Sequence, residues 1–159
     1  GYGAALKTGF RNVNTKYIGF IDADLTYDPF LIPVLLRTLI TKDLDCTWGN
    51  RFGGKVNEMP FIRKIGNRII STAFFLATFK KVTDCSSGER VLKRETLEKI
   101  DFETLPNGLD FITAFTKRLV SRKMKYLEIP TNYKSRIGRS KLNIFNHGYR
   151  MLKNVIKEA

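Results

Sequence analysis

The chain of 159 residues carries 28 Lys and Arg against 15 Asp and Glu, which gives a formal net charge of +13. This length fits one domain of ordinary size and excludes most two-domain enzymes, and a hydrophobic content of 43% excludes a disordered basic tail. Cys46 and Cys85 are too few for a disulfide framework and lack CxxC spacing. We therefore expect a folded domain with buried thiols in a reducing compartment.

The charge is unevenly distributed along the chain. Residues 1–36 contain three basic and three acidic residues, so the rest of the chain carries the whole positive excess. Residues 131–159 alone hold seven Lys and Arg and a single Glu. An anionic partner is therefore expected near the C-terminal end, whether a phosphate, a lipid headgroup or a nucleic acid.

The first half of the chain alternates helix and strand patterns. Apolar residues at helical spacing predict a helix over 3–13, and the apolar run over 17–21 predicts a buried parallel strand that stops at the ligand edge of a sheet. Asp28 and Pro29 predict the start of a helix with Asp28 as its N-cap. Next we expect a strand over 45–49, a loop over 53–57, and a long helix from Met59 to about Phe79.

The second half continues the alternation and completes an α/β pattern. We expect a strand over 87–93, helices over 95–100 and 108–122, and a strand over 125–130 that extends to Lys134. The last helix, about 141–158, is amphipathic and basic, which suits packing on the sheet and lying on an anionic membrane surface equally well. The whole chain, 1–159, thus predicts a single α/β domain.

The most apolar stretch, 69–79, is too short to cross a bilayer. Because it is apolar nearly all round, it is expected either to be buried or to insert partly into a membrane.

An acidic pair follows the first predicted strand. Because side chains alternate along a strand, Asp22 and Asp24 would point to one side. Two carboxylates there can hold a hard divalent cation, with water and substrate phosphates in the remaining positions. A turn or a helix cap is the structural alternative. With Thr26, the pair also matches the opening motif of haloacid-dehalogenase-type phosphatases, although no later acidic pair completes that site.

Six segments occur in a characteristic order, at 1–10, 22–29, 49–51, 59–63, 83–90 and 136–142. Together they resemble the family 2 inverting glycosyltransferases with a GT-A fold, and within them the dolichyl-phosphate mannosyltransferases and their glucosyl relatives. The resemblance implies a partial GT-A, Rossmann-like domain with a mixed sheet and flanking helices. That family's domain begins with strand-helix units for the nucleotide base, which this chain lacks, so we expect 1–159 to be its C-terminal portion and to bind a sugar nucleotide poorly alone.

The same resemblance assigns the acidic pair to the donor. Asp22 and Asp24 would bind Mg²⁺ or Mn²⁺ and, through it, the diphosphate of the sugar nucleotide. Thr26 stands where the family usually has glutamine, and we include it as a third candidate ligand. Glu89 stands where the family commonly has an aromatic residue, and the sequence offers no explanation for that change.

Basic residues complete the site that the resemblance implies. The arginines that hold donor and acceptor phosphates map onto Arg51, Arg63 and Arg136. Ser140 and Lys141 lie beside the last of these and are expected to bind the donor with it. The candidate catalytic residues are therefore Asp24, Arg51, Arg63, Asp84 and Arg136.

The implied reaction transfers a hexose, mannose before glucose, from GDP-mannose or UDP-glucose to a polyprenyl or dolichyl phosphate with inversion. A phosphate monoester is already ionised near pH 7, because its second pKa is about 6. No strong base is then required, in keeping with a single histidine, His147. A hydroxyl acceptor would instead need a base, for which Asp84 is the candidate.

The resemblance also implies a location and a set of partners. A polyprenyl phosphate lies in a membrane, so we expect a cytoplasmic protein, peripheral on the cytoplasmic face of a membrane with an anionic surface. A basic nucleic-acid-binding module is the alternative explanation of the +13 charge. Because no nucleic-acid motif is present, we expect no nucleic acid partner.

Overall fold

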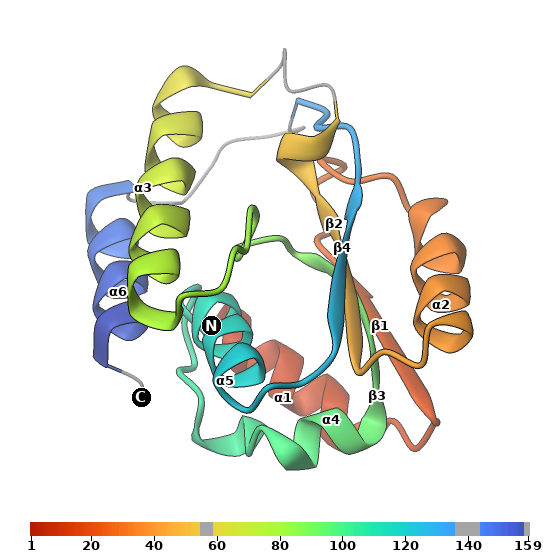
Figure 1. The fold of residues 1–159 in the computed structure, drawn as a ribbon. Coiled ribbons are helices and arrows are strands. Elements are labelled where there is room, and N and C mark those ends of the chain that lie inside the picture. The colour runs from red at the N-terminus through yellow and green to blue at the C-terminus, as the bar shows by residue number, and fades with distance from the viewer. Residues whose placement is uncertain (55–58, 136–143, 158–159) are drawn as a thin grey trace.

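A four-stranded mixed sheet forms the centre of the molecule (Figure 1), in a computed structural model that describes residues 1–54, 59–135 and 144–157. The strands are β1 (Tyr17–Ile21), β2 (Cys46–Asn50), β3 (Glu89–Lys93) and β4 (Tyr126–Pro130), in the order β1-β3-β2-β4. β3 is antiparallel to both of its neighbours, whereas β2 and β4 are parallel. The predicted mixed sheet is therefore confirmed.

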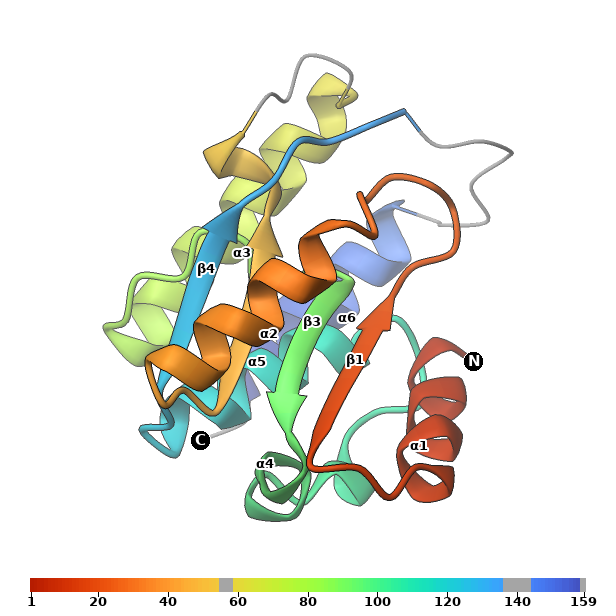
Figure 2. The same cartoon turned by 90° about the vertical axis from the view of Figure 1, so that its right-hand side faces the viewer.

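Helices cover both faces of this sheet. They are α1 (Tyr2–Asn12), α2 (Leu31–Thr41), α3 (Phe61–Thr78), α4 (Arg94–Lys99), α5 (Phe111–Ser121) and α6 (Ile144–Lys157). Figures 1 and 2 show α2 alone on one face and α3, α5 and α6 on the other, which makes three layers. Short 3-10 turns follow β2 (Arg51–Gly53) and α4 (Phe102–Thr104).

Two apolar clusters explain why these elements pack as they do. On the α2 face, Leu35 and Leu39 lie one helical turn apart and are fully buried against Val91 of β3. On the other face the larger cluster combines aliphatic side chains with aromatic ones, among them the fully buried Trp48 and Phe115. Both cysteines are buried and free, as the sequence predicts, and burial raises the pKa of each thiol to about 12.

The first strand differs from its prediction. β1 pairs antiparallel with β3 and lies at the edge of the described sheet, and it is only partly buried. An apolar run of five residues shows that a strand packs on a core, but it carries no information about the direction of the neighbour. The prediction of a buried parallel strand was therefore wrong.

Two predicted boundaries also shift. α2 begins at Leu31 because the Asp28 carboxylate accepts the backbone N–H of Phe30 within a turn, three residues ahead of the helix. β4 ends at Pro130, and the next residue continues beside β2 through a bond from the Thr131 N–H to the Asn50 carbonyl (2.9 Å). This extension, which we expected to be a strand, carries the chain back towards the end of β1.

The two apolar helices next to the larger cluster are amphipathic. α3 buries Ile70 and Phe74, whereas Ile69 and Leu76 on the same helix are exposed, so the stretch over 69–79 is not buried all round. α6 packs on α3 and α5 and buries Val155, and residues 141–143 and 158 of the predicted last helix lie outside the described residues. None of the helices in the described part of the chain has the length and apolar character that crossing a membrane requires.

Candidate active site

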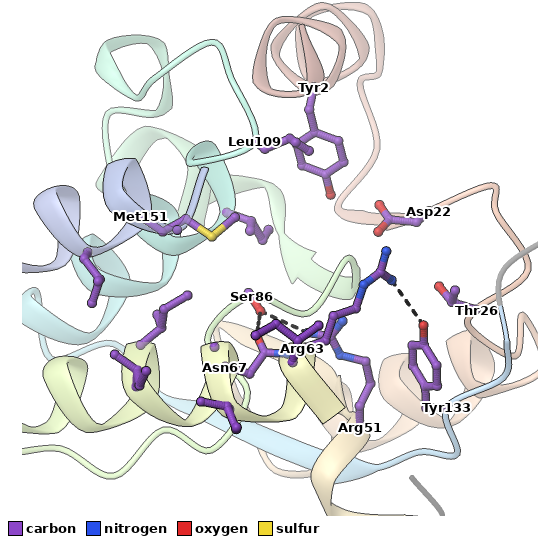
Figure 3. Close-up of a pocket in the computed structure, with 18 of the residues that line it drawn as sticks. Tyr2, Asp22, Thr26, Arg51, Arg63, Asn67, Ser86, Leu109, Tyr133 and Met151 are labelled. Atoms are coloured by element: carbon purple, nitrogen blue, oxygen red, sulfur yellow. Dashed lines mark hydrogen bonds between the residues drawn. The ribbon is translucent and has the colours of Figure 1, made fainter. Parts of the chain in front are cut away.

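A pocket of about 490 Å³ lies between the end of β1 and the layer formed by α3, α5 and α6 (Figure 3). One end is polar and is lined by Tyr2, Asp22, Asp24, Thr26, Tyr27, Arg51, Arg63, Asn67, Ser86 and Tyr133. The other end is apolar and is lined by Ile62, Ile65, Ile69, Ile70, Leu109, Ile112, Met151 and Leu152. The pocket thus joins a charged site to a hydrophobic groove.

Asp22 and Asp24 both line the pocket, but not by strand alternation. β1 ends at Ile21, and the Asp22 N–H continues the ladder to the Gly88 carbonyl at 3.1 Å. Asp24 lies in the turn that follows, in which Leu25 adopts a left-handed conformation with a φ of 63°. The structure therefore brings the two residues to one pocket, although a turn rather than the strand places Asp24 there.

The turn fixes the Asp24 carboxylate through Thr26. The Thr26 hydroxyl donates to Asp24 Oδ1 at 2.6 Å, and the Thr26 N–H donates to the same oxygen at 3.1 Å. Thr26 is buried, and its hydroxyl proton is used on the carboxylate. These two bonds fix the orientation of the Asp24 carboxylate, and the role of Thr26 as a metal ligand stays a prediction.

The acidic pair suits a cation that brings its own additional oxygen ligands. Among residues 1–54, 59–135 and 144–157 there is no group of three or more His, Cys, Asp or Glu that could enclose a metal ion. Mg²⁺ is usually held by one or two carboxylates together with water and substrate phosphates. Two carboxylates beside an open pocket, Asp22 and Asp24, fit that pattern.

Arg51 follows β2 and is held by a buried carboxylate. Its Nε and Nη2 donate to the two oxygens of Asp84, both at 2.7 Å, and Nη2 also donates to Ser86 Oγ at 3.0 Å. Glu128 of β4 accepts the backbone N–H groups of Thr83 and Asp84, which fixes this loop against the sheet. Burial alone would lower the pKa of Arg51, but the charge of Asp84, its hydrogen bonds to Arg51 and the nearby Tyr27 and Asp22 together raise that pKa above its ordinary value.

This pairing places Asp84 behind Arg51. Asp84 is buried, and both of its oxygens accept hydrogen bonds from the guanidinium. It does not line the pocket, whereas Arg51 does. This position disfavours Asp84 as the catalytic base, because a base must reach the acceptor hydroxyl. It supports instead a role for Asp84 in orienting Arg51.

Arg63, in the first turn of α3, reaches into the polar end of the pocket (Figure 3). Its Nη1 donates to the Tyr133 hydroxyl at 3.3 Å. The segment after β4 brings Tyr133 here, because the Lys134 N–H bonds to the Thr26 carbonyl at 3.2 Å. Arg136, Ser140 and Lys141, the other basic and polar residues expected at the site, lie outside the described residues.

Five polar residues of the pocket were not predicted from the sequence, namely Tyr2, Tyr27, Asn67, Ser86 and Tyr133. Tyr2, Tyr27 and Ser86 lie inside three of the segments that carried the family resemblance, so their positions were available as a signal. Asn67 and Tyr133 lie outside those segments, and only the three-dimensional arrangement brings them to the pocket. The pKa of Tyr2 is raised by burial and, beyond that, by the charge of Asp22 and a hydrogen bond to it.

Glu89 lies on the opposite face of the sheet from this pocket. Its side chain is fully buried, neither carboxylate oxygen has a hydrogen-bond partner among the described residues, and its neighbours include Gly49 and Leu31. Burial, with a smaller contribution from the charge of Asp28, raises the pKa of Glu89 to about 7. Glu89 is thus a core residue in this chain, at a position where the family commonly carries an aromatic side chain.

The family model described as "Glycosyl transferase family 2" matches residues 1–101, which is more than half of the chain and includes Asp22, Asp24, Arg51, Arg63 and Asp84. The chain belongs to glycosyl transferase family 2. This membership confirms the resemblance that the six segments carried, and it decides against the phosphatase alternative.

Two curated relatives of this family 2 chain come from Haloferax volcanii and Pyrococcus furiosus. It is 29% identical to the low-salt glycan biosynthesis hexosyltransferase Agl6 of Haloferax volcanii, over 100% of this chain and 39% of that protein. It is also 29% identical to the dolichol-phosphate mannosyltransferase of Pyrococcus furiosus, over 96% of this chain and 45% of that protein. The chain therefore spans less than half the length of these two relatives.

Solved structures support the fold of the family 2 chain. The glucosyl-3-phosphoglycerate synthase of Mycobacterium tuberculosis, in complex with Mn²⁺, UDP-glucose and phosphoglyceric acid, superposes with a TM-score of 0.72 at 15% identity. The match covers 98% of this chain and 54% of that one. The expected GT-A type of α/β fold is thereby confirmed.

Proposed function

We propose that this family 2 chain takes part in transferring a hexose from a nucleotide-diphosphate sugar to a polyprenyl or dolichyl phosphate, with inversion at the anomeric carbon. Mannose is the first choice of sugar and glucose the second. The observation that carries the proposal is the two-ended pocket, in which carboxylates and arginines meet a groove lined by isoleucines of α3. A lipid phosphate has the same two parts, an anionic head and an apolar chain.

In the polar end of the pocket, Asp22 and Asp24 would hold Mg²⁺ or Mn²⁺ against the diphosphate of the sugar nucleotide. The bound cation would act as a Lewis acid that neutralises the charge of the leaving diphosphate. Thr26 fixes the Asp24 carboxylate and the Gly88 carbonyl fixes the Asp22 backbone before any ligand binds, so little reorganisation is needed when the donor arrives. Two crystal structures of the mycobacterial synthase with UDP contain Mn²⁺ and Mg²⁺, respectively.

Arg63, also in the polar end of the pocket, is suited to bind the phosphate of the acceptor. Its planar guanidinium can bind two phosphate oxygens at once, and the hydroxyl that it contacts, that of Tyr133, is neutral. The phosphate oxygen is already ionised near pH 7 and can attack without a general base. This agrees with the position of Asp84, whose oxygens are occupied by Arg51.

The apolar end would receive the first part of the lipid chain. Ile62, Ile65 and Ile69 follow one another along α3 and line the pocket, and each is at least 40% exposed. Exposed apolar side chains on α3 and the neighbouring Tyr149 of α6 would then face the membrane that holds the acceptor. The relatives named dolichol-phosphate mannosyltransferase and dolichyl-phosphate hexose transferase support this class of acceptor.

A transfer assay with the complete gene product tests the proposal. GDP-mannose or UDP-glucose with a labelled sugar, Mn²⁺ and dolichyl phosphate should give label in the organic phase, and Asp22→Ala should abolish it. Ile69→Asp should weaken use of the lipid acceptor at least tenfold, whereas Ile40→Asp should not. Ile40 is the matched control because it is 49% exposed on α2, away from the pocket, against 52% for Ile69.

Two results would overturn the proposal. One is label that appears only in water-soluble products when phosphoglycerate or a free sugar is offered as an alternative acceptor. The other is lipid transfer that Asp22→Ala leaves intact, because the donor would then not be held at the acidic pair.

A further inference from the structure

Tyr27 closes the turn that carries the acidic pair, a role that the function proposed above does not assign. Tyr27 is buried and lines the polar end of the pocket. Its hydroxyl oxygen accepts the backbone N–H of Gly88 at 2.8 Å. The Gly88 carbonyl in turn accepts the Asp22 N–H at 3.1 Å. Gly88 is therefore bonded to both ends of the segment 22–27, through its carbonyl to the first residue and through its N–H to the last.

The turn between these two bonds has a backbone that needs support. Leu25 has a φ of 63°, in the left-handed region that leucine disfavours, and such a conformation persists only where its surroundings hold it. Within the turn, the Asp24 carboxylate accepts the N–H and the hydroxyl of Thr26. The bond from Tyr27 to Gly88 adds a connection to the sheet, because Gly88 directly precedes β3.

The position of Gly88 also determines where the Asp22 side chain lies. The Asp22 carboxylate packs so closely over Gly88 that a Cβ at this position would overlap it. A shift of the Gly88 backbone would therefore move both the main chain and the carboxylate of Asp22. The Tyr27 hydroxyl opposes such a shift, because moving Gly88 away would leave a buried N–H without its acceptor.

The Tyr27 ring is itself fixed by Arg51. The guanidinium carbon of Arg51 lies over the ring, 5.7 Å from its centroid, which is within the range of a cation–π interaction. Asp84 holds that guanidinium through two hydrogen bonds of 2.7 Å. Tyr27 thus connects three parts of the site, namely the acidic turn, the backbone of Gly88 and the pair formed by Arg51 and Asp84.

We propose that Tyr27 is a positioning residue for the divalent cation, because its hydroxyl, by holding Gly88, fixes the placement of Asp22 relative to Asp24. This inference rests on the proposed function, since it takes these two carboxylates to hold Mg²⁺ or Mn²⁺. Residues that orient metal ligands typically contribute about 10- to 100-fold to metal affinity. Tyr27 acts through a backbone group, so we expect an effect at the lower end of this range.

Two measurements on the complete gene product test this role without turnover. Amide hydrogen exchange in EDTA, followed by nuclear magnetic resonance, reports how firmly the turn over 22–27 is held. Free Mn²⁺, measured by electron paramagnetic resonance during titration, reports cation affinity. Tyr27→Phe removes only the hydroxyl and keeps the ring next to Arg51. We expect it to speed exchange of the Asp22 and Thr26 amides about tenfold and to weaken Mn²⁺ binding about tenfold.

Thr47→Val is the matched control for the loss of a buried hydroxyl. The Thr47 hydroxyl donates to the Leu35 carbonyl at 3.0 Å, and Thr47 is fully buried on β2 and is not among the pocket residues. Both variants should lower the unfolding temperature in EDTA to a similar extent, because each loses one buried hydrogen bond. Only Tyr27→Phe should change the exchange of the turn amides and the affinity for Mn²⁺.

The outcomes separate this inference from the proposed function. If Asp22→Ala loses Mn²⁺ binding while Tyr27→Phe keeps either the wild-type exchange rates or the wild-type affinity, the role of Tyr27 is refuted and the cation site stands. If wild type shows no saturable Mn²⁺ binding, or Asp22→Ala binds as well as wild type, the cation site and the role of Tyr27 fail together. Faster exchange with weaker Mn²⁺ binding in Tyr27→Phe alone supports the inference. The same two changes in Thr47→Val would overturn it, since loss of stability would then explain them.

Discussion

The buried carboxyl of Glu89 makes the stability of this protein depend on pH in a defined direction. Glu89 is fully buried between the sheet and the start of α2, and no described residue donates a hydrogen bond to either oxygen. The charge of Asp28 contributes to the raised pKa of Glu89, and the ammonium of Lys134 lies 3.8 Å from Asp28. Ionisation of Glu89 therefore places a buried negative charge where no described residue donates a hydrogen bond to it.

The pKa of Glu89 fixes the sign and the size of the effect. It rises from an ordinary value of 4.5 to about 7 in the folded protein. Between these pH values the folded state holds a proton that the unfolded chain has released, so stability falls as pH rises through this window and the loss is complete above it. Each pKa unit is worth about 1.4 kcal/mol, which gives a loss of about 2 to 3 kcal/mol when partial relaxation around the charge is allowed for.

Glu89→Gln isolates this contribution, because glutamine keeps the size of the side chain and cannot ionise. Urea unfolding of both proteins at pH 5 and pH 8.5 should give similar free energies at pH 5, and the variant should be more stable by about 2 kcal/mol at pH 8.5. Glu98→Gln, at an exposed position on α4, is the control and should follow wild type at both pH values. Parallel pH profiles for wild type and Glu89→Gln would refute the reasoning.

Two further predictions concern the polar end of the pocket. Gly88→Ala should lower the free energy of unfolding by about 1 to 3 kcal/mol and weaken Mn²⁺ binding, because the new Cβ overlaps the Asp22 carboxylate. The control Gly9→Ala, in open space on α1, should instead raise the free energy of unfolding by about 0.5 to 1 kcal/mol. Equal unfolding curves for the two variants would contradict this prediction. Asp84→Asn should cost about 3 to 5 kcal/mol in urea unfolding, since it leaves the Arg51 guanidinium without its carboxylate, and a loss below about 1 kcal/mol would show that the pair is not a structural unit.

Local sequence patterns were sufficient for the element order and for the acidic pair. Apolar spacing located α1, α2, α3 and α5 to within a few residues, because a helix that packs on a sheet needs one apolar stripe. The strands were located as well, but not their pairing. Nothing in the run over 17–21 distinguishes a parallel neighbour from the antiparallel β3, which is more than sixty residues away in sequence.

Long-range partners are what the sequence could not supply. Asp84 was a reasonable base as an isolated carboxylate beside Ser86, and only the fold shows that Arg51, 33 residues earlier, occupies both of its oxygens. Glu89 had no explanation until the position of Gly49 beneath it was known. In both cases the deciding fact is what surrounds the side chain, and neighbours distant in sequence determine it.

The two described arginines of the site consequently differ more than their equal treatment in the sequence suggests. The charge of Arg51 is compensated by Asp84, so a phosphate near it would meet a nearly neutral pair with donor N–H groups. Arg63 contacts the neutral Tyr133 and stands on α3, the helix that also supplies the apolar wall. Of these two arginines, Arg63 would therefore supply more charge complementarity to a lipid phosphate in the groove, whereas the Arg51 guanidinium is held by Asp84. The net charge of +13 thus says little about the site by itself, because function depends on which cations remain uncompensated beside the pocket.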